Sequence, residues 1–311
     1  NVIGKIYAGI ADDMLTTTIM ATKAPKYLCP AMNTEMYNNP ITQRNLEGLR
    51  SLGYHIMDPA EGWLACGITG VGRLPEPEAI VDWLESKMCS TNELEGTTIL
   101  VTAGGTQESI DPVRYIGNRS SGKMGYAIAE QAVRMGAKVI LVSAPTSLPI
   151  PSGVDFISVD SAVSMQEAVE ARYNDVNVVI MAAAVSDFRV LHKAEQKIKK
   201  MESMTIELVK NPDILQGLGS KKSHQILVGF AAETEHVIKY GQDKVARKNL
   251  DMLVANDVSK SNAGFNVDTN EGYFLYPDKE PKEMPNMKKS DLARHILREV
   301  IDLVANKADI N

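Results

Sequence analysis

The chain has 311 residues, of which 44% are hydrophobic and 23% are charged, and its formal net charge is −6. This is the composition of an ordinary globular protein, so it excludes a disordered chain, a collagen-like repeat and a coiled coil. A mildly acidic chain is not a general nucleic-acid binder, and because no run approaches about 18 consecutive apolar residues, we expect no transmembrane helix.

At about 150 residues per domain, the length predicts two domains. No basic segment followed by an apolar one opens the chain, so we expect no signal peptide. The three cysteines, Cys29, Cys66 and Cys89, are widely spaced and odd in number. This argues against a disulfide framework, and we therefore expect a reducing, cytoplasmic location.

Residues 1–15 are predicted to form one helix, because Ile3, Ile6 and Ile10 follow helical spacing. No initiator Met and no leading strand precede them, so we expect the chain to begin inside a domain. Up to residue 88 the pattern then predicts short strands at 26–29 and 55–58, helices at 42–52 and 77–88, and loops at 30–37 and 61–77. The polar segment 89–96 predicts a domain boundary, which divides the chain into 1–91 and 92–311.

After this boundary, apolar strands alternate with helices. The predicted strands are 97–102, 138–143, 155–159, 176–182, 226–230, 252–255 and 272–276. The predicted helices are 123–135, 163–173, 236–248 and 290–306, and Asp213 is expected to cap a further one. This alternation is typical of an α/β fold with a doubly wound, mostly parallel, Rossmann-like sheet that helices cover on both faces.

Small residues follow the first of these strands, in the sequence Thr102-Ala-Gly-Gly-Thr106. In a doubly wound sheet, ligands bind beyond the carboxyl ends of the strands. Consecutive small residues allow the backbone to approach a ligand and to direct N–H groups at anionic oxygens. An ordinary tight strand-to-helix turn explains the same residues equally well, so both interpretations stay open.

The segment 114–125 nearly matches the phosphate-binding pattern G-x-x-x-x-G-K-[ST], through Gly117, Gly122 and Lys123. Met124 stands where that pattern has a metal-binding hydroxyl, and the segment does not directly follow the first strand. We therefore reject a standard P-loop ATPase. A helix that begins here still presents N–H groups and the positive end of its dipole, so with its basic residues and Asn118 the segment is predicted to bind an anion.

Polar or aromatic residues also follow the later strands. Asp187 suits a ribose, a base or a metal ion, but it also suits a helix N-cap. The basic run 197–200 is either solvated surface or a neutraliser of phosphate charge. Phe230 either stacks on a base or packs in the core. Lys244 and Lys248 share one helical face, which is either solvated or a phosphate clamp.

Cys66 lies in a Gly-rich loop, without a CxxC partner or a nearby His, which argues against a metal site. A proton-donating or nucleophilic thiol and a neutral structural thiol both remain open. Cys29 is expected to lie in the core of its domain.

Several ordered motifs together resemble the bacterial bifunctional flavoproteins of coenzyme A biosynthesis, which fuse phosphopantothenoylcysteine decarboxylase to phosphopantothenate–cysteine ligase. The decarboxylase motifs are Pro30-Ala-Met-Asn-Thr-Glu-Met36 and Ala65-Cys-Gly-Ile-Thr-Gly-Val-Gly-Arg73. The ligase motifs are Thr102-Ala-Gly-Gly-Thr106, Ser120-Ser-Gly-Lys-Met-Gly125, Lys197-Ile-Lys-Lys200, Lys210-Asn-Pro-Asp213, Gly229-Phe-Ala-Ala-Glu-Thr234 and Arg247-Lys-Asn-Leu-Asp251. The resemblance implies the end of a flavodoxin-like decarboxylase domain followed by a ligase domain.

The resemblance implies two reactions. The ligase activates the carboxylate of 4′-phosphopantothenate with CTP and a divalent metal, Mg²⁺ or Mn²⁺, and cysteine then converts the acyl-cytidylate to an amide. The decarboxylase uses FMN to oxidise the cysteinyl thiol, which lets carbon dioxide leave, and the enethiol is reduced to 4′-phosphopantetheine.

The resemblance also implies roles for individual residues. Asn118 is expected to stabilise the acyl-cytidylate, with Arg114 and Lys123 holding anionic groups. Asn33 would orient the substrate carboxylate of the decarboxylase, and Cys66 would donate a proton to the enethiol. The nucleotide-binding positions are Ala183, Asp187, Lys197, Asn211, Pro212, Asp213, Ile214, Phe230, Lys244 and Lys248. Arg119 departs from some members, which have His there, and Tyr37 stands where Trp is common.

The family's decarboxylase opens with a strand, an FMN phosphate loop and a catalytic His, none of which precedes Asn1. We therefore expect an N-terminally truncated chain, with FMN bound by the full-length protein. The family's ligase half is dimeric and its decarboxylase half is trimer-based, so we expect a homo-oligomer that binds small molecules, without nucleic acid or membrane.

Two other functions compete with this one. A dinucleotide-dependent oxidoreductase would suit a parallel sheet, but the loop at Gly104 is not G-x-G-x-x-G and no acidic residue closes the second strand at Ser143. A non-enzymatic flavoprotein sensor would suit residues 1–91 taken alone.

Overall fold

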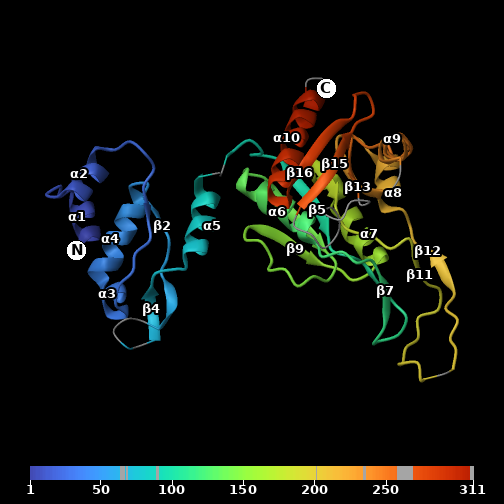
Figure 1. The fold of residues 1–311 in the computed structure, drawn as a ribbon, viewed down its shortest axis with the longest axis horizontal. Coiled ribbons are helices and arrows are strands. Elements are labelled where there is room, and N and C mark those ends of the chain that lie inside the picture. The colour runs from blue at the N-terminus through green and yellow to red at the C-terminus, as the bar shows by residue number, and fades with distance from the viewer. Residues whose placement is uncertain are drawn as a thin grey trace. The chain divides into compact units, whose positions relative to one another are not determined.

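We describe a computed structural model of the chain, which covers residues 1–63, 67, 69–88, 91–200, 202–233, 236–257 and 269–308. The chain consists of two compact units, Asn1–Ser90 and Thr91–Asn311 (Figure 1). The prediction that 1–91 and 92–311 are separate domains stays a prediction.

The first unit combines short helices with two small sheets. Its elements are α1 (Val2–Ala8), α2 (Met14–Ala21), β1 (Tyr27–Leu28), α3 (Thr34–Asn38), α4 (Pro40–Ser51), β2 (His55–Ile56), β3 (Ala60–Trp63), β4 (Thr69–Arg73) and α5 (Pro77–Met88). Strands β1 and β2 pair in parallel, and β3 and β4 form an antiparallel hairpin.

Three predictions for this unit were wrong. The single helix over 1–15 is two helices, because Gly9 ends α1 in the left-handed region (φ 72°) and Asp13 starts α2 with a capping box. Loop 30–37 contains α3, which Asn33 caps, and loop 61–77 contains β3 and β4. The spacing of apolar residues does not reveal a capping residue or a short hairpin whose side chains are largely exposed.

The second unit is built on an eight-stranded sheet, within the described residues. Its strands are β5 (Thr98–Ala103), β8 (Lys138–Ser143), β9 (Val154–Ser158), β10 (Val178–Met181), β13 (Ile226–Glu233), β14 (Met252–Asp257), β15 (Thr269–Leu275) and β16 (Lys282–Lys288). Their order is β16-β15-β14-β13-β10-β5-β8-β9, and β15 and β16 alone run antiparallel to their neighbours. This confirms the predicted mostly parallel α/β sheet.

Helices cover both faces of this sheet. They are α6 (Lys123–Arg134), α7 (Ala162–Glu170), α8 (Ile214–Lys221), α9 (Val237–Arg247) and α10 (Lys289–Ala308), with a 3₁₀ turn, η1 (Tyr173–Asp175). Successive strand residues point to opposite faces. Ile99 and Val101 therefore belong to the core cluster under α6 and α10, whereas Leu100 belongs to the cluster under α7, α8 and α9.

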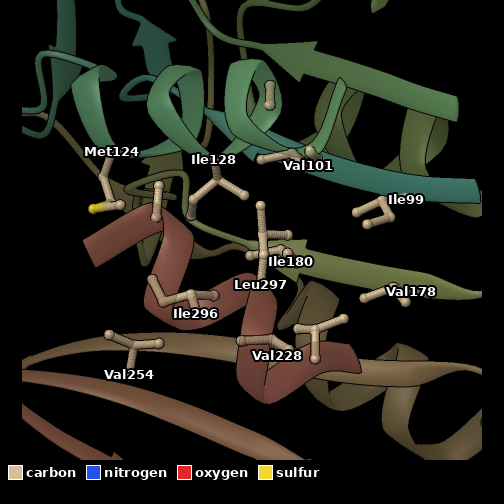
Figure 2. Packing of buried hydrophobic residues seen from close by; sticks show 14 of the residues in the cluster. Ile99, Val101, Met124, Ile128, Val178, Ile180, Val228, Val254, Ile296 and Leu297 are labelled. Atoms are coloured by element: carbon tan, nitrogen blue, oxygen red, sulfur yellow. The ribbon is translucent and has the colours of Figure 1, made fainter. Parts of the chain in front are cut away.

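Figure 2 shows the first of these clusters, where α6 and α10 lie side by side over the strands. Ile128 of α6 and Leu297 of α10 are completely buried there, with Val101 and Ile180 from the sheet. Complete burial of one such side chain contributes about 1.5–3 kcal/mol before entropy is subtracted. The burial of these side chains stabilises the sheet and thereby keeps the ends of its strands in place.

Two short hairpins were not predicted. One joins β6 (Gln107–Ser109) to β7 (Tyr115–Gly117), and the other joins β11 (Phe188–Val190) to β12 (Leu208–Lys210). Strand β16 was also missed, because its Pro285 is tolerated only at a sheet edge, which is where β16 lies. Strand β11 contacts β6, so the two hairpins are neighbours in space.

Candidate functional site

The strand order of the sheet reverses between β5 and β10. From β5 the chain continues to β8 and β9 on one side, and from β10 it continues to β13 and β14 on the other. Ligands of open α/β sheets bind in the crevice beyond the carboxyl ends of the strands at such a switch point. The Gly-rich loop after β5 and the Asp187 segment after β10 both begin here.

The backbones of these two strand extensions are joined to each other. The N–H of Ala184 donates to the carbonyl of Gly104 at 2.8 Å, and the N–H of Thr106 donates to the carbonyl of Ala184 at 3.2 Å. The buried hydroxyl of Thr102 accepts from the N–H of Ala183 at 3.1 Å. The two loops therefore form one continuous floor.

Glycine is required where this floor meets its neighbours. Gly104 has a φ of 81°, and a Cβ on it would lie 2.7 Å from the carbonyl oxygen of Ala144. A Cβ on Gly105 would lie 2.7 Å from the carbonyl oxygen of Asn118. The interpretation of this loop as a strand-to-helix turn was wrong, because β6 and not a helix follows β5. The close approaches give the two glycines a packing reason, and the approach of the loop to a ligand stays a prediction.

Asn118 follows β7 and lies over this floor. Its amide nitrogen donates to the carbonyls of Ala184 at 3.3 Å and Val185 at 3.2 Å. The candidate catalytic residue is thus brought to the switch point from a hairpin that the strand pattern did not predict. These two carbonyls accept from the same amide nitrogen that was expected to donate to the reacting oxygen of the substrate.

The start of α6 also lies at the switch point. Gly122, in the left-handed region with φ 77°, is its N-cap and makes no side-chain capping bond. A Cβ on Gly122 would lie 3.3 Å from the backbone nitrogen of Gly104. Lys123 lies in the first turn and also lines a cavity of about 410 Å³ with Tyr126, Ala127, Glu130, Leu148, Pro149, Ile150, Pro151 and Ser152. A helix start with a lysine is suited to an anion.

Arg114 makes different contacts from those expected of an anion-binding residue. Its guanidinium forms an ion pair with Asp111 and donates to the carbonyl of Ile198 at 3.0 Å. The hydrogen bond from Arg114, with backbone N–H groups, holds the pKa of the Asp111 carboxyl well below its usual range against the effect of burial. Asp111 was not among the residues that sequence reasoning selected.

The segment 211–214 is attached to the exit of β10. The side chain of Asn211, only 5% exposed, donates to the carbonyl of Ser186 at 2.8 Å, and its N–H donates to the carbonyl of Asp187 at 2.8 Å. Pro212 is partly buried, and Ile214 is buried. The alternative that Asp187 caps a helix was wrong, because β11 follows it, and the Asp187 side chain is exposed.

Asp213 caps α8, as predicted, and accepts from the N–H of Gln216 at 3.0 Å. Lys248 forms a 2.8 Å ion pair with the same carboxylate, and its side chain is 18% exposed. Burial raises the pKa of Asp213, but the hydrogen bonds from Lys248 and Gln216 outweigh it and hold the pKa below its usual value. Lys248 is therefore not a solvated surface lysine.

Other candidates are distributed around the same unit. Lys197 is exposed in the connection between β11 and β12, and Lys244 is partly buried on α9. Phe230 is partly buried on β13 and packs against the core cluster under α6 and α10. This contact agrees with core packing, while the partial burial of Phe230 leaves its stacking on a base a prediction.

Sequence reasoning quoted Thr106 within a motif but assigned no role to it or to Ser186, and the two residues join the β5 and β10 exits. The hydroxyl of Thr106 accepts from the N–H of Ser186 at 2.9 Å. Among the described residues, the buried hydroxyl of Ser186 has no hydrogen-bond partner. Their positions directly after β5 and β10 were the available signal, since polar side chains at strand ends face the crevice.

In the first unit, Asn33 caps α3 and accepts from the N–H of Glu35 at 2.8 Å. The N–H of the preceding Met32 donates to the carbonyl of Gly72 at 2.9 Å, which attaches this loop to β4. Cys66 lies outside the described residues, in the connection between β3 and β4. Cys29 is only partly buried, although burial raises the pKa of its thiol.

Two absences concern the described residues only. They contain no helix that is both long and apolar enough to cross a membrane. They also contain no group of three or more His, Cys, Asp or Glu side chains placed to hold a metal ion.

Two families match the chain. Residues 94–304 match the family described as DNA/pantothenate metabolism flavoprotein C-terminal domain, and residues 1–89 match the flavoprotein family. A protein named coenzyme A biosynthesis bifunctional protein CoaBC from Bacillus subtilis (strain 168) is 50% identical over 307 residues, which are 97% of this chain and 76% of that protein. The protein of the same name from Escherichia coli (strain K12) is 44% identical, over 97% and 75%.

Solved structures agree with these matches. The C-terminal domain of a coenzyme A biosynthesis bifunctional protein CoaBC has 44% identity and a TM-score of 0.61, and the match covers 70% of this chain and all of that one. The DNA/pantothenate metabolism flavoprotein from Streptococcus pneumoniae has 22% identity and a TM-score of 0.57, over 66% and 98%, and it supports the fold alone.

Proposed function

The chain belongs to the family of bifunctional coenzyme A biosynthesis proteins, and we propose a division of its two activities between the units. Residues 91–311 carry the phosphopantothenate–cysteine ligase. Residues 1–90 belong to the phosphopantothenoylcysteine decarboxylase. The observation that supports the ligase assignment best is the position of Asn118 over the β10 exit, at the switch point of the sheet.

The ligase reaction has two steps. A carboxylate oxygen of 4′-phosphopantothenate attacks the α-phosphorus of CTP, and pyrophosphate leaves. The amine of cysteine then attacks the acyl carbon, and cytidine monophosphate leaves. Mg²⁺ or Mn²⁺ would be carried to the site by CTP, because substrate phosphates usually supply part of the ligands of Mg²⁺.

Asn118 acts in the second half of this sequence. Its amide nitrogen exchanges the carbonyls of Ala184 and Val185 for the oxygen that gains charge when cysteine attacks. An amide donor stabilises such an oxygen without adding a charge of its own. The start of α6 and Lys123 hold an anionic group of the substrate.

The nucleotide lies along the exits of β10 and β13. Asn211 attaches the segment 211–214 to the β10 exit, because it is bonded to the backbone of Ser186 and Asp187. Lys197, Lys244 and Lys248 neutralise the charge of the phosphates. The other residues contact the rest of the nucleotide. The proposed nucleotide-binding residues are Ala183, Asp187, Lys197, Asn211, Pro212, Asp213, Ile214, Phe230, Lys244 and Lys248.

The decarboxylase acts on the product of the ligase. FMN, when bound, supplies the two-electron oxidation of the cysteinyl thiol. In this chain the proposed substrate-side residues are Asn33, which orients the carboxylate, and Cys66, which donates a proton to the enethiol. The loop that carries Asn33 is attached to β4 through Met32. We further propose a cytoplasmic homo-oligomer.

The test is a substrate-dependence assay on the purified chain. With CTP, 4′-phosphopantothenate and cysteine present, pyrophosphate and cytidine monophosphate are expected in equal amounts. Without cysteine, pyrophosphate should stop at about one equivalent per site. A folded sample that releases no pyrophosphate, or one that instead reduces a nicotinamide dinucleotide with the same substrates, would contradict the ligase assignment.

A further inference from the structure

Asp111 is a buried carboxylate with no assigned role. It lies between β6 and β7, and its side chain is 0% exposed. A buried charge is costly unless charged and hydrogen-bonded partners compensate for it. One carboxylate oxygen accepts from the N–H groups of Val113 and Arg114, at 2.8 and 2.9 Å, and this local turn would be enough to shape the hairpin.

The second oxygen of Asp111 makes contacts that the local turn does not need. It accepts from Nε of Arg114 at 3.0 Å and from the N–H of Ile198 at 3.1 Å, 87 positions further along the chain. The guanidinium of Arg114 donates in turn to the carbonyl of Ile198 at 3.0 Å. The Asp111–Arg114 pair therefore binds both backbone polar groups of one distant residue.

Ile198 lies within the basic run 197–200, directly after Lys197. A further bond joins the same two regions, since the N–H of Ala194 donates to the carbonyl of Ile110 at 2.9 Å. The hairpin that carries Asp111 ends at Gly117, next to Asn118. One ion pair thus relates the position of Lys197 to that of Asn118.

We propose that Asp111 is a positioning residue for the ligase reaction, which fixes the backbone beside Lys197 through Arg114 and thereby sets where that lysine meets the triphosphate of CTP. This inference rests on the proposed function. It also gives Arg114 a role other than substrate binding, because its planar fork reaches the Asp111 carboxylate through two nitrogens and donates to the carbonyl of Ile198 as well, a fixed geometry that the single ammonium of a lysine does not match.

A double-mutant cycle tests the inference. Asp111→Asn and Lys197→Gln are each expected to lower kcat/KM for CTP about tenfold, mainly through a higher KM. If Asp111 acts through Lys197, the double variant should also be about tenfold slower, and not about a hundredfold, because residues that act as a unit are not additive. Lys193→Gln, an exposed lysine of the same connection, is the matched control and should leave kcat/KM unchanged.

Additive effects of the two substitutions, or normal kinetics in Asp111→Asn, would overturn the inference. Because removing one partner of a buried pair is strongly destabilising, Arg114→Lys is the second variant and takes the place of Asp111→Asn if that protein does not fold. Loss of the folded state in both would make the pair purely structural. Wild-type protein that releases no pyrophosphate with CTP would instead refute the proposed function.

Discussion

At the scale of single residues, the site depends on side chains that satisfy backbone groups of a distant segment. Asn118 donates to two carbonyls of the β10 exit, and Asn211 donates to a third. Thr102 and Thr106 accept from N–H groups of the same exit. These polar residues therefore fix the backbone beyond β10, which is what a site at this position requires.

Asn118→Asp should stop the ligase after nucleotide binding. The carboxylate keeps the shape of the side chain, but it cannot donate to the carbonyls of Ala184 and Val185 and it places a negative charge beside the reacting oxygen. Loss of one such donor typically lowers kcat about 10²- to 10³-fold. Steady-state kinetics should show this fall with a nearly unchanged KM for CTP.

The control for this prediction is Asn174→Asp, at an exposed position of the turn η1. It introduces the same charge away from the switch point and should leave kcat as it is. Normal turnover by Asn118→Asp would remove Asn118 from the proposed mechanism.

At the scale of elements, α8 shows how a local signal and a distant charge combine. Asp213 starts the helix as its N-cap, and Lys248, from the end of α9, pairs with the same carboxylate. A glycine determines how closely a second helix, α6, packs on the sheet. A Cβ on Gly125 of α6 would lie 2.7 Å from the Cβ of Ala103 on β5. Helix α6 therefore lies unusually near the sheet.

Asp213→Ala should destabilise the protein by about 1 kcal/mol at pH 7 through loss of the cap. The folded pKa of Asp213 lies below its unfolded value of 3.8, so the charged carboxylate contributes fully above pH 3.8 and its contribution falls as the pH drops below that value. Denaturant unfolding at pH 7 and pH 3 should show a smaller deficit at pH 3.

Ser161→Ala is the matched control, because Ser161 caps α7 through a neutral hydroxyl. Its deficit should be the same at both pH values. An Asp213→Ala deficit that does not change with pH would mean that the ion pair with Lys248 contributes nothing.

Two helical glycines should respond in opposite ways to alanine. Gly125→Ala should destabilise by about 1–3 kcal/mol, because its new methyl group would overlap β5. Gly217→Ala on α8 should stabilise by about 0.5–1 kcal/mol, since nothing lies within 4 Å of its Cβ position and alanine favours a helix. Thermal unfolding of both variants checks this, and equal shifts would contradict the close packing of α6.

At the scale of the whole molecule, the second unit has its own core on both faces of one sheet. Every strand of that sheet, and each helix that covers it, comes from residues after 91. The residues proposed for the ligase reaction also lie after this point. Nothing in the described sheet therefore depends on a strand from the first unit.

Residues 92–311 expressed alone should fold and release pyrophosphate with CTP, 4′-phosphopantothenate and cysteine. A chain that begins at residue 104 lacks β5, which lies between β8 and β10, and should fail to fold. Circular dichroism and a pyrophosphate assay check both proteins. A folded but inactive 92–311 would mean that the ligase needs the first unit.

The amino-acid sequence by itself determined the elements with strong local signals. The strand 138–143 and the helix 77–88 have their predicted ends, and Asp213 caps the helix that it was expected to cap. Apolar periodicity and capping depend on residues within a few positions of one another, so one sequence is enough to predict them. The ligase motifs likewise indicated the family before any geometry was known.

Only the tertiary structure decided which of these residues meet. The hairpins β6–β7 and β11–β12 have three-residue strands, and Asp111 reaches Ile198 across 87 positions. The sequence predicts a helix cap for Asp213 and allows a solvated surface position for Lys248, but the two side chains form one ion pair. Contacts of this kind leave no periodic trace in the sequence, because they are selected by the order of the strands in the sheet, which brings the carboxyl ends of β5 and β10 together.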